Sequence, residues 1–121
     1  MSDGPAAPGH GAPIKVMVVD DSATMRTWLS IVIDKDPRLT VVAQAANAIE
    51  ARDLIKETNP DILTLDLEMP EMNGIDFLAH LMRLRPMPVI VFSGLVADQS
   101  EVATAALKLG AYACIPKPVS P

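Results

Sequence analysis

The chain has 121 residues, half of them hydrophobic, and a formal net charge of −5. This length favours one domain with a core of its own, and the acidic charge gives no support to nucleic-acid binding. The single cysteine, Cys114, excludes an intramolecular disulfide and fits a reducing cytoplasm, and the apolar runs are too short to cross a membrane.

Residues 1–13 are rich in Gly, Pro and Ala and lack the apolar stretch of a secretory signal, so we expect a disordered leader there. The first strand is predicted at Ile14–Val19, directly before Asp20 and Asp21. Ser22 is a suitable N-cap for a helix that ends at residues 36–37. Its predicted apolar face consists of Met25, Trp28, Leu29, Val32 and Ile33.

The second strand is predicted at Leu39–Ala43, a short stretch rich in β-branched residues. Asn47 and Glu50 then have the spacing of a capping box, with Asn in place of Ser or Thr. The helix that they begin ends at residues 59–60. We expect its buried face to contain Ala51, Leu54 and Ile55.

The third strand is predicted at Ile62–Leu65, an apolar or β-branched run that ends on the carboxylate of Asp66. A short run that is apolar on both faces is typical of a buried strand in a parallel sheet. Pro70 and the Asn73-Gly74 pair predict a loop directly afterwards. Asp66 therefore lies at the end of a buried strand, where open α/β sheets bind their ligands.

The remaining chain repeats this alternation. A helix is predicted at Gly74–Leu84, and a fourth strand at Val89–Phe92 ends at Ser93. A further helix at Asp98–Gly110 has an apolar face made mostly of alanine, so we expect it to be weakly anchored. The fifth strand, at Ala111–Ile115, leads to Lys117. Strands that alternate with amphipathic helices predict an α/β fold with one parallel sheet and helices on both faces.

The functional residues follow from the strand ends. Asp20, Asp21, Asp66, Ser93 and Lys117 all follow or end strands, and a parallel sheet brings such positions to one edge. Three neighbouring carboxylates need a counter-charge, and an all-oxygen site with open positions suits Mg²⁺. With an ammonium and a hydroxyl beside it, a free carboxylate can attack phosphorus, so the pattern predicts phosphoryl transfer.

Each of these residues also has an ordinary explanation. Asp20 and Asp21 can cap a helix, Asp66 can belong to a turn, Ser93 can be structural, and Lys117 can be a solvated surface charge. The coincidence of suitable groups at four of the five strand ends favours a functional site.

These residues carry a resemblance to a known family. Asp20-Asp21-Ser22, the stretch Asp66–Gly74, Ser93-Gly94 and Lys117-Pro118 resemble the receiver domain of two-component response regulators over nearly the whole ordered chain. Within that family, segments 51–56, 63–66 and 81–89 are most similar to the receiver domain of chemotaxis methylesterases (CheB). The resemblance implies a flavodoxin-like (CheY-like) doubly wound sheet of five parallel strands in the order 2-1-3-4-5.

The resemblance also implies a role for each residue. Asp66 would be the phospho-acceptor, with a CheA-like histidine kinase as donor and a downstream effector domain or protein as output. Asp20, Asp21, Asp66 and the backbone carbonyl of Glu68 would hold Mg²⁺. Ser93 and Lys117 would contact the phosphoryl group. Such a receiver is a cytoplasmic signalling module that catalyses only its own phosphorylation and dephosphorylation.

Two departures from the family pattern stand out. Cys114 occupies a position where receivers usually carry an aromatic residue, so either Tyr112 replaces that residue or coupling to the output face differs. The family's fifth helix and the methylesterase domain are not in this sequence. We therefore expect a receiver domain over residues 14–121 that is truncated after strand five, with one sheet face partly uncovered.

Three other functions stay open at this point. A phosphohydrolase with an aspartyl-phosphate would place Asp-x-Asp after the first strand and add a cap, whereas Asp20 and Asp21 are adjacent. A flavodoxin-like cofactor binder would need a phosphate-binding loop there, and two carboxylates would repel an anion. A docking module that works without phosphorylation is the third alternative.

Overall fold

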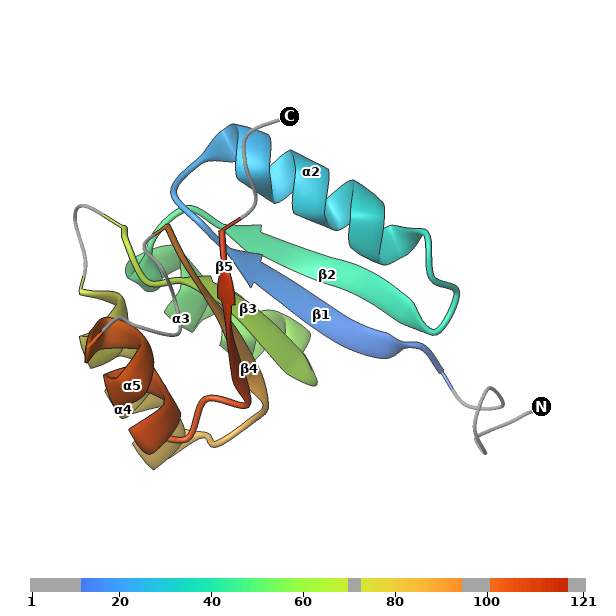
Figure 1. Ribbon diagram of the computed structural model, residues 1–121. Helices are drawn as coiled ribbons and strands as arrows, with labels where there is room; N and C mark the ends of the chain where they lie inside the picture. The colour runs from blue at the N-terminus through green and yellow to red at the C-terminus, as the bar shows by residue number, and fades with distance from the viewer. Residues whose placement is uncertain (1–11, 70–72, 95–100, 118–121) are drawn as a thin grey trace.

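The computed structural model describes residues 12–69, 73–94 and 101–117. Its elements alternate along the chain (Figure 1). They are β1 (Ile14–Val19), α2 (Ala23–Asp34), β2 (Leu39–Ala45), α3 (Ala48–Thr58), β3 (Ile62–Asp66), α4 (Gly74–Leu84), β4 (Val89–Ser93), α5 (Glu101–Lys108) and β5 (Ala113–Pro116). The strands form one sheet in the order β2-β1-β3-β4-β5, and all adjacent pairs are parallel. This confirms the predicted fold class and strand order.

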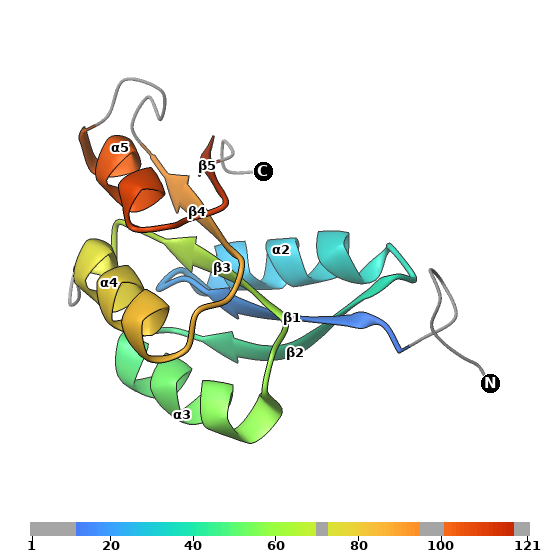
Figure 2. The ribbon, with the colours of Figure 1, turned by 90° about the horizontal axis from the view of Figure 1, so that it is seen from below.

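The helices lie on both faces of the sheet. Figure 2 shows α2 on one face and α3, α4 and α5 on the other. Side chains alternate between the faces along each strand, so Met17 and Val19 of β1 join the larger core while Val18 joins Met25 and Leu29 beneath α2. No helix in the described ranges is long and apolar enough to cross a membrane.

The helix caps follow the sequence closely. Ser22 Oγ accepts a hydrogen bond from Met25 N at 3.2 Å, which confirms the predicted N-cap of α2. Asn47 Oδ1 accepts from Glu50 N at 2.9 Å, while Glu50 Oε1 accepts from Ala46 N at 2.8 Å. The predicted capping box is therefore present, but its return bond reaches the residue before the cap.

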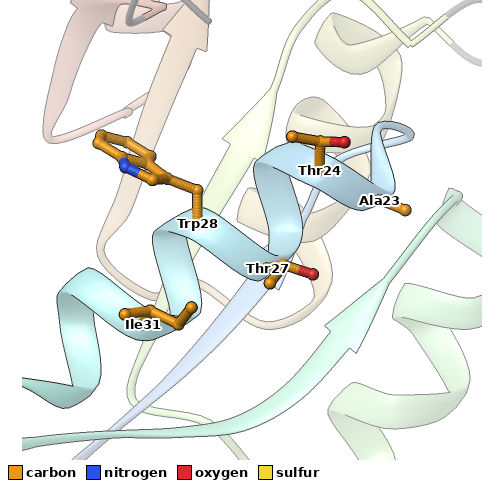
Figure 3. Close-up of a pocket in the computed structure, with 5 residues that line it drawn as sticks. All are labelled: Ala23, Thr24, Thr27, Trp28 and Ile31. Atoms are coloured by element: carbon orange, nitrogen blue, oxygen red, sulfur yellow. The ribbon is translucent and has the colours of Figure 1, made fainter. Parts of the chain in front are cut away.

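The predicted apolar face of α2 was partly wrong. Met25 and Leu29 are buried, but Val32 is 43% exposed. Successive residues of an α-helix are 100° apart around its axis. Because Ser30 is buried as well, the buried face of α2 is centred nearer to Ile33, and Val32 lies at the edge of that face. The outer side of α2 borders a shallow hollow of about 410 Å³ (Figure 3), which is lined by Ala23, Thr24, Thr27, Trp28 and Ile31.

Several boundaries differ from the prediction. β2 extends two residues further, to Ala45. α5 ends at Lys108, two residues before the predicted end, and its description begins at Glu101 because residues 95–100 lie outside the described ranges. Within α5, Ala103 and Ala106 are buried as expected, but Val102 and Leu107 are exposed. The predicted leader over residues 1–13 lies outside the described residues except for its last two. Residues 118–121 also lie outside them.

The start of β5 was also predicted too early. Gly110 has a φ of 112°, and Ala111 N donates to Ala106 O at 3.0 Å. These contacts close α5 and place Ala111 in the turn, so β5 begins only at Ala113. Tyr112 therefore precedes the strand.

A surface ion pair gives the first testable prediction. Arg38 contacts the Asp36 carboxylate through Nε at 3.0 Å and Nη2 at 2.7 Å, and its backbone N–H donates to the same group at 2.9 Å. The side-chain hydrogen bonds from Arg38, supported by the backbone bond, lower the pKa of Asp36 to about 2. Since the folded pKa is depressed, the pair stabilises the native state above about pH 4, and this contribution is lost as the pH falls through about 2.

A carboxyl-carbon NMR titration checks this value. In Arg38→Ala the pKa of Asp36 should rise towards 3.8, held back only by the remaining backbone bond. The matched control is Lys35→Ala, which removes the neighbouring cation but keeps the hydrogen bonds from Arg38 to Asp36, and it should leave the pKa of Asp36 unchanged. A wild-type Asp36 that titrates near 3.8 would contradict the prediction.

Candidate functional site

The predicted site residues meet at the carboxyl edge of the sheet. Asp20 follows β1, Asp66 and Ser93 end β3 and β4, and Lys117 follows β5. Lys117 N donates to Ser93 O at 2.7 Å, which fixes the end of β5 against β4. One carboxylate oxygen each from Asp20, Asp21 and Asp66 lies within 4.8 Å of the other two. The structure therefore brings together the acidic cluster and the lysine.

Asp20 and Asp21 have different environments although they are neighbours. Asp20 is buried and its Oδ1 accepts from Ser22 N at 2.8 Å, whereas Asp21 is exposed. Burial raises the pKa of Asp20, and the nearby charges of Asp66 and Asp21 add to this, while Ser22 and Lys117 partly offset it. Asp20 thus carries an unfavourable buried charge that a cation would relieve.

Arg26 contributes a contact that the sequence analysis missed. Its Nη1 donates to the backbone carbonyl of Asp20 at 2.7 Å from the first turn of α2. The sequence shows a basic residue six positions after Asp20. The contact between the two residues depends on the path of the turn between β1 and α2, which the sequence alone does not specify. This bond ties the end of β1 to the helix that follows.

Lys117 forms a charged link between two buried carboxylates. Its Nζ lies 3.0 Å from Asp66 Oδ2 and 3.5 Å from Asp20 Oδ2. Burial alone would lower the pKa of Lys117, but the hydrogen bond and charge of Asp66, together with Asp20, raise it above its ordinary value. Lys117 therefore remains a fixed ammonium in the site.

The donor set fits a hard divalent cation. Three carboxylates share the site with one ammonium, so negative charge remains in excess. Asp66 Oδ2 faces Lys117, and Oδ1 accepts from Glu68 N at 2.9 Å. Carboxylate oxygens are the ligands that Mg²⁺ and Ca²⁺ prefer, so Asp20, Asp21 and Asp66 can hold such an ion.

Ser93 and Glu68 form a second contact that the sequence did not predict. Ser93 is buried and its Oγ donates to Glu68 Oε2 at 3.1 Å. Sequence reasoning placed only the backbone carbonyl of Glu68 in the site, whereas its side chain reaches the hydroxyl. A Cβ on Gly94 would lie 2.6 Å from Glu68 Oε1, so the glycine leaves room for this carboxylate.

Cys114, at the position where receivers usually carry an aromatic residue, and Tyr112, its possible replacement, are not among the residues of the acidic cluster. Cys114 is half-buried against the larger core, and burial raises the pKa of its thiol. Tyr112 is 78% exposed and precedes β5. A role for Tyr112 in coupling stays a prediction, and it would require the ring to move from solvent to the sheet edge.

Comparison with known proteins assigns the chain to a family whose fold and acidic site agree with the geometry described above. The family profile described as "Response regulator receiver domain" matches residues 16–121. A protein-glutamate methylesterase/protein-glutamine glutaminase of Rhizobium johnstonii is 54% identical over 107 residues, covering 88% of this chain and 31% of that protein. A relative of the same name from Chromohalobacter salexigens is 56% identical over 105 residues, 87% of this chain and 30% of that protein. The chain therefore spans about a third of the length of these relatives.

Solved structures extend the comparison. The response regulator domain of Thermotoga maritima CheB has a TM-score of 0.81 and 42% identity, covering 88% of this chain and 79% of that chain. A structure of the P1 domain of CheA3 in complex with CheY6 from R. sphaeroides has a TM-score of 0.76 and 39% identity, with 90% and 85% covered. The fold, the acidic cluster and the length of the family match lead to one conclusion: this chain belongs to the response regulator receiver domains, with chemotaxis methylesterases of the CheB type among its relatives.

Proposed function

We propose that this domain is a phosphorylation-controlled switch in which a histidine kinase transfers a phosphoryl group to Asp66 with the help of Mg²⁺. The observation that carries this proposal is the contact of Lys117 Nζ with Asp66 Oδ2, at 3.0 Å, beside the carboxylates of Asp20 and Asp21. This arrangement supports the proposal, because a carboxylate that can act as a nucleophile lies beside two further carboxylates that can bind a cation and beside a fixed positive charge.

The chain's own residues account for the steps. An Asp66 oxygen attacks the phosphorus of the donor, the phosphorus–nitrogen bond of the phosphohistidine breaks, and the imidazole leaves with the electron pair and takes up a proton. Lys117 moves from the carboxylate to a phosphoryl oxygen, and Ser93 turns its hydroxyl from Glu68 to the new group. Mg²⁺ held by Asp20, Asp21, Asp66 and the carbonyl of Glu68 would neutralise charge on the phosphoryl oxygens.

The relatives support the choice of partners. A structure of a CheA3 P1 domain with CheY6 supports a CheA-like kinase as donor. The methylesterase relatives are about three times as long as the aligned region, which supports an effector domain or protein as the output. In this proposal the receiver acts in the cytoplasm, has no separate substrate of its own, and passes its state on through altered contacts.

The proposal is tested by intact mass after incubation with Mg²⁺ and acetyl phosphate. The wild type and Asp53→Ala should gain the mass of one phosphoryl group, and Asp66→Ala should gain none. Asp53 is a matched control because it is an exposed aspartate on α3, away from the cluster. A wild type without adduct, or an adduct that persists in Asp66→Ala, would refute the assignment of Asp66.

Replacing Asp21, one of the three carboxylates proposed to bind Mg²⁺, should weaken cation binding without affecting the fold. Because Asp21 is exposed, Asp21→Asn should fold normally, yet its affinity for Mg²⁺ should fall by about tenfold with the loss of one charged ligand. Ion binding to the native state raises the melting temperature, so the Mg²⁺-dependent shift should occur at higher concentrations in the variant. Asp53→Asn is the control, and equal shifts in wild type and Asp21→Asn would exclude Asp21 as a ligand.

A further inference from the structure

A groove on the α3–α4 side of the sheet has no part in the phosphorylation site. It has a volume of about 350 Å³ and lies between α3 and α4, which run next to each other on one face of the sheet (Figure 2). Its apolar lining consists of Ile55 from α3 and Phe77, Leu81 and Leu84 from α4. Leu84 is 76% exposed, so the groove presents a large apolar side chain to solvent.

The rim of the groove is basic although the chain as a whole is acidic. Arg52, Lys56 and Arg85 line it together with His80, and no carboxylate is among its lining residues in the part of the chain described. The ion pairs found among the described residues do not include any of these three cations. Arg85 donates to the Asn59 side chain and to Pro60 O, and both acceptors are uncharged. Three cations without an ion pair among the described residues therefore line this groove, in a chain with a net charge of −5.

We propose that this groove binds an acidic amphipathic helix of a partner protein. Phe77 and Leu81 are only 4% and 7% exposed and form the floor of the groove, while Leu84 forms an exposed apolar edge beside the basic rim. A helix with one apolar stripe flanked by acidic residues would match this arrangement of a narrow apolar strip and a basic rim. Asp and Glu residues flanking that stripe would pair with Arg52, Lys56 and Arg85 at the rim. This inference goes beyond the proposed function and does not depend on it.

A protein helix fits better than an anionic membrane. A membrane surface is flat, whereas the apolar residues here line a hollow between two helices. The net charge of −5 also repels an anionic bilayer at long range, and three cations provide only weak attraction to such a surface. A bound helix would contact only the groove, so its charge needs to complement only the basic residues at the rim and not the whole surface of the domain.

The test uses the full chain labelled with ¹⁵N and a synthetic peptide of about 15 residues, long enough to form a helix. The peptide carries Leu at positions i, i+4 and i+7 with Glu on both sides, and a second peptide has the same composition with the Leu spacing scrambled. Titration to about 1 mM should shift amide signals of α3 and α4 with the first peptide only. Shifts located elsewhere, equal shifts with both peptides, or no shifts at this concentration would overturn the proposal.

Variants locate the interaction. Lys56→Glu and Leu84→Ala should each weaken peptide binding by about three- to tenfold, since both side chains are exposed and neither supports the core. Lys35→Glu makes the same charge change at the end of α2 and should leave the affinity unchanged. An equal loss in Lys35→Glu would indicate non-specific attraction and overturn the proposal. So would binding to phosphatidylserine vesicles in the absence of peptide binding. Far-UV circular dichroism and the dispersion of the amide signals serve as the folding check, because Lys56 and Leu84 are exposed and should not affect the fold.

Discussion

Replacing Lys117 with methionine is expected to destabilise the cation-free domain by about 2–4 kcal/mol at pH 7. Methionine keeps the length and the apolar stem of lysine but removes the ammonium that contacts Asp66 at 3.0 Å and Asp20 at 3.5 Å. The side chains of these two carboxylates are only 1% and 3% exposed, so water replaces the lost partner poorly. This loss is smaller than for a completely buried pair because Lys117 itself is 21% exposed.

The loss should depend on pH in a defined direction. The pKa of Lys117 is raised in the folded state, so its contribution is complete below the ordinary value of 10.5 and is lost only as the pH rises through the folded pKa. The pKa of Asp20 is already raised by burial, and it should rise further without Lys117. Acidification then protonates the unpaired carboxylate in the variant first. The difference in stability between wild type and variant should therefore shrink as the pH falls from 7 towards 4.

Urea denaturation of wild type, Lys117→Met and Lys35→Met at several pH values measures this effect. Lys35→Met removes an exposed lysine and should change stability little. The phosphorylation rate with acetyl phosphate should also fall in Lys117→Met by on the order of 100-fold, through loss of a positive charge at the phosphoryl oxygens. A variant that keeps wild-type stability at every pH would show that Lys117 does not compensate the buried carboxylates.

Replacing Gly74 with alanine should destabilise the fold by about 2–3 kcal/mol, although alanine is the better helix former by about 1 kcal/mol. A Cβ at this position would lie 2.7 Å from Leu67 Cα and 3.0 Å from Leu67 O. These are backbone atoms of the segment directly after Asp66, so they can move only if the site moves with them. The steric cost therefore exceeds the gain in helix propensity.

The matched control is Gly94→Ala. There the described atom nearest to the new Cβ is Glu68 Oε1, at 2.6 Å, at the end of a side chain that can rotate away. Gly94→Ala should cost less than about 1 kcal/mol but break the Ser93–Glu68 hydrogen bond. Urea denaturation followed by circular dichroism compares the two variants. Equal stabilities would show that the β3–α4 loop adapts more easily than the close approach to Leu67 indicates.

The strands and the acidic cluster could be predicted from the sequence because they follow from strong local rules. Short apolar runs such as Ile62–Leu65 specify buried strands, and a parallel sheet must bring their carboxyl ends to one edge. The positions of Asp20, Asp66 and Lys117 follow from this topology without knowledge of any side-chain conformation. The order of the strands required the resemblance to the family as well.

The features that sequence reasoning missed depend on packing and rotamers. The Glu68–Ser93 bond needs one particular side-chain conformation, and no spacing rule predicts it. The exposure of Val32 follows from a small rotation of α2 about its axis, which the apolar stripe alone does not determine. The groove between α3 and α4 arises from how two helices pack side by side, so its basic rim is not apparent in either helix alone.

The uneven burial on the two faces of the sheet has a consequence for local opening. Among the described residues, the buried apolar cluster beneath α2 consists of Val18, Met25 and Leu29, whereas the core under α3 and α4 is much larger. The amide protons of α2 should therefore exchange with solvent through partial unfolding more readily than those of α4. Because α2 begins at the turn that holds Asp20 and Asp21, an ion bound there would slow that exchange. The exchange rate of the α2 amides would then measure whether an ion occupies the acidic cluster.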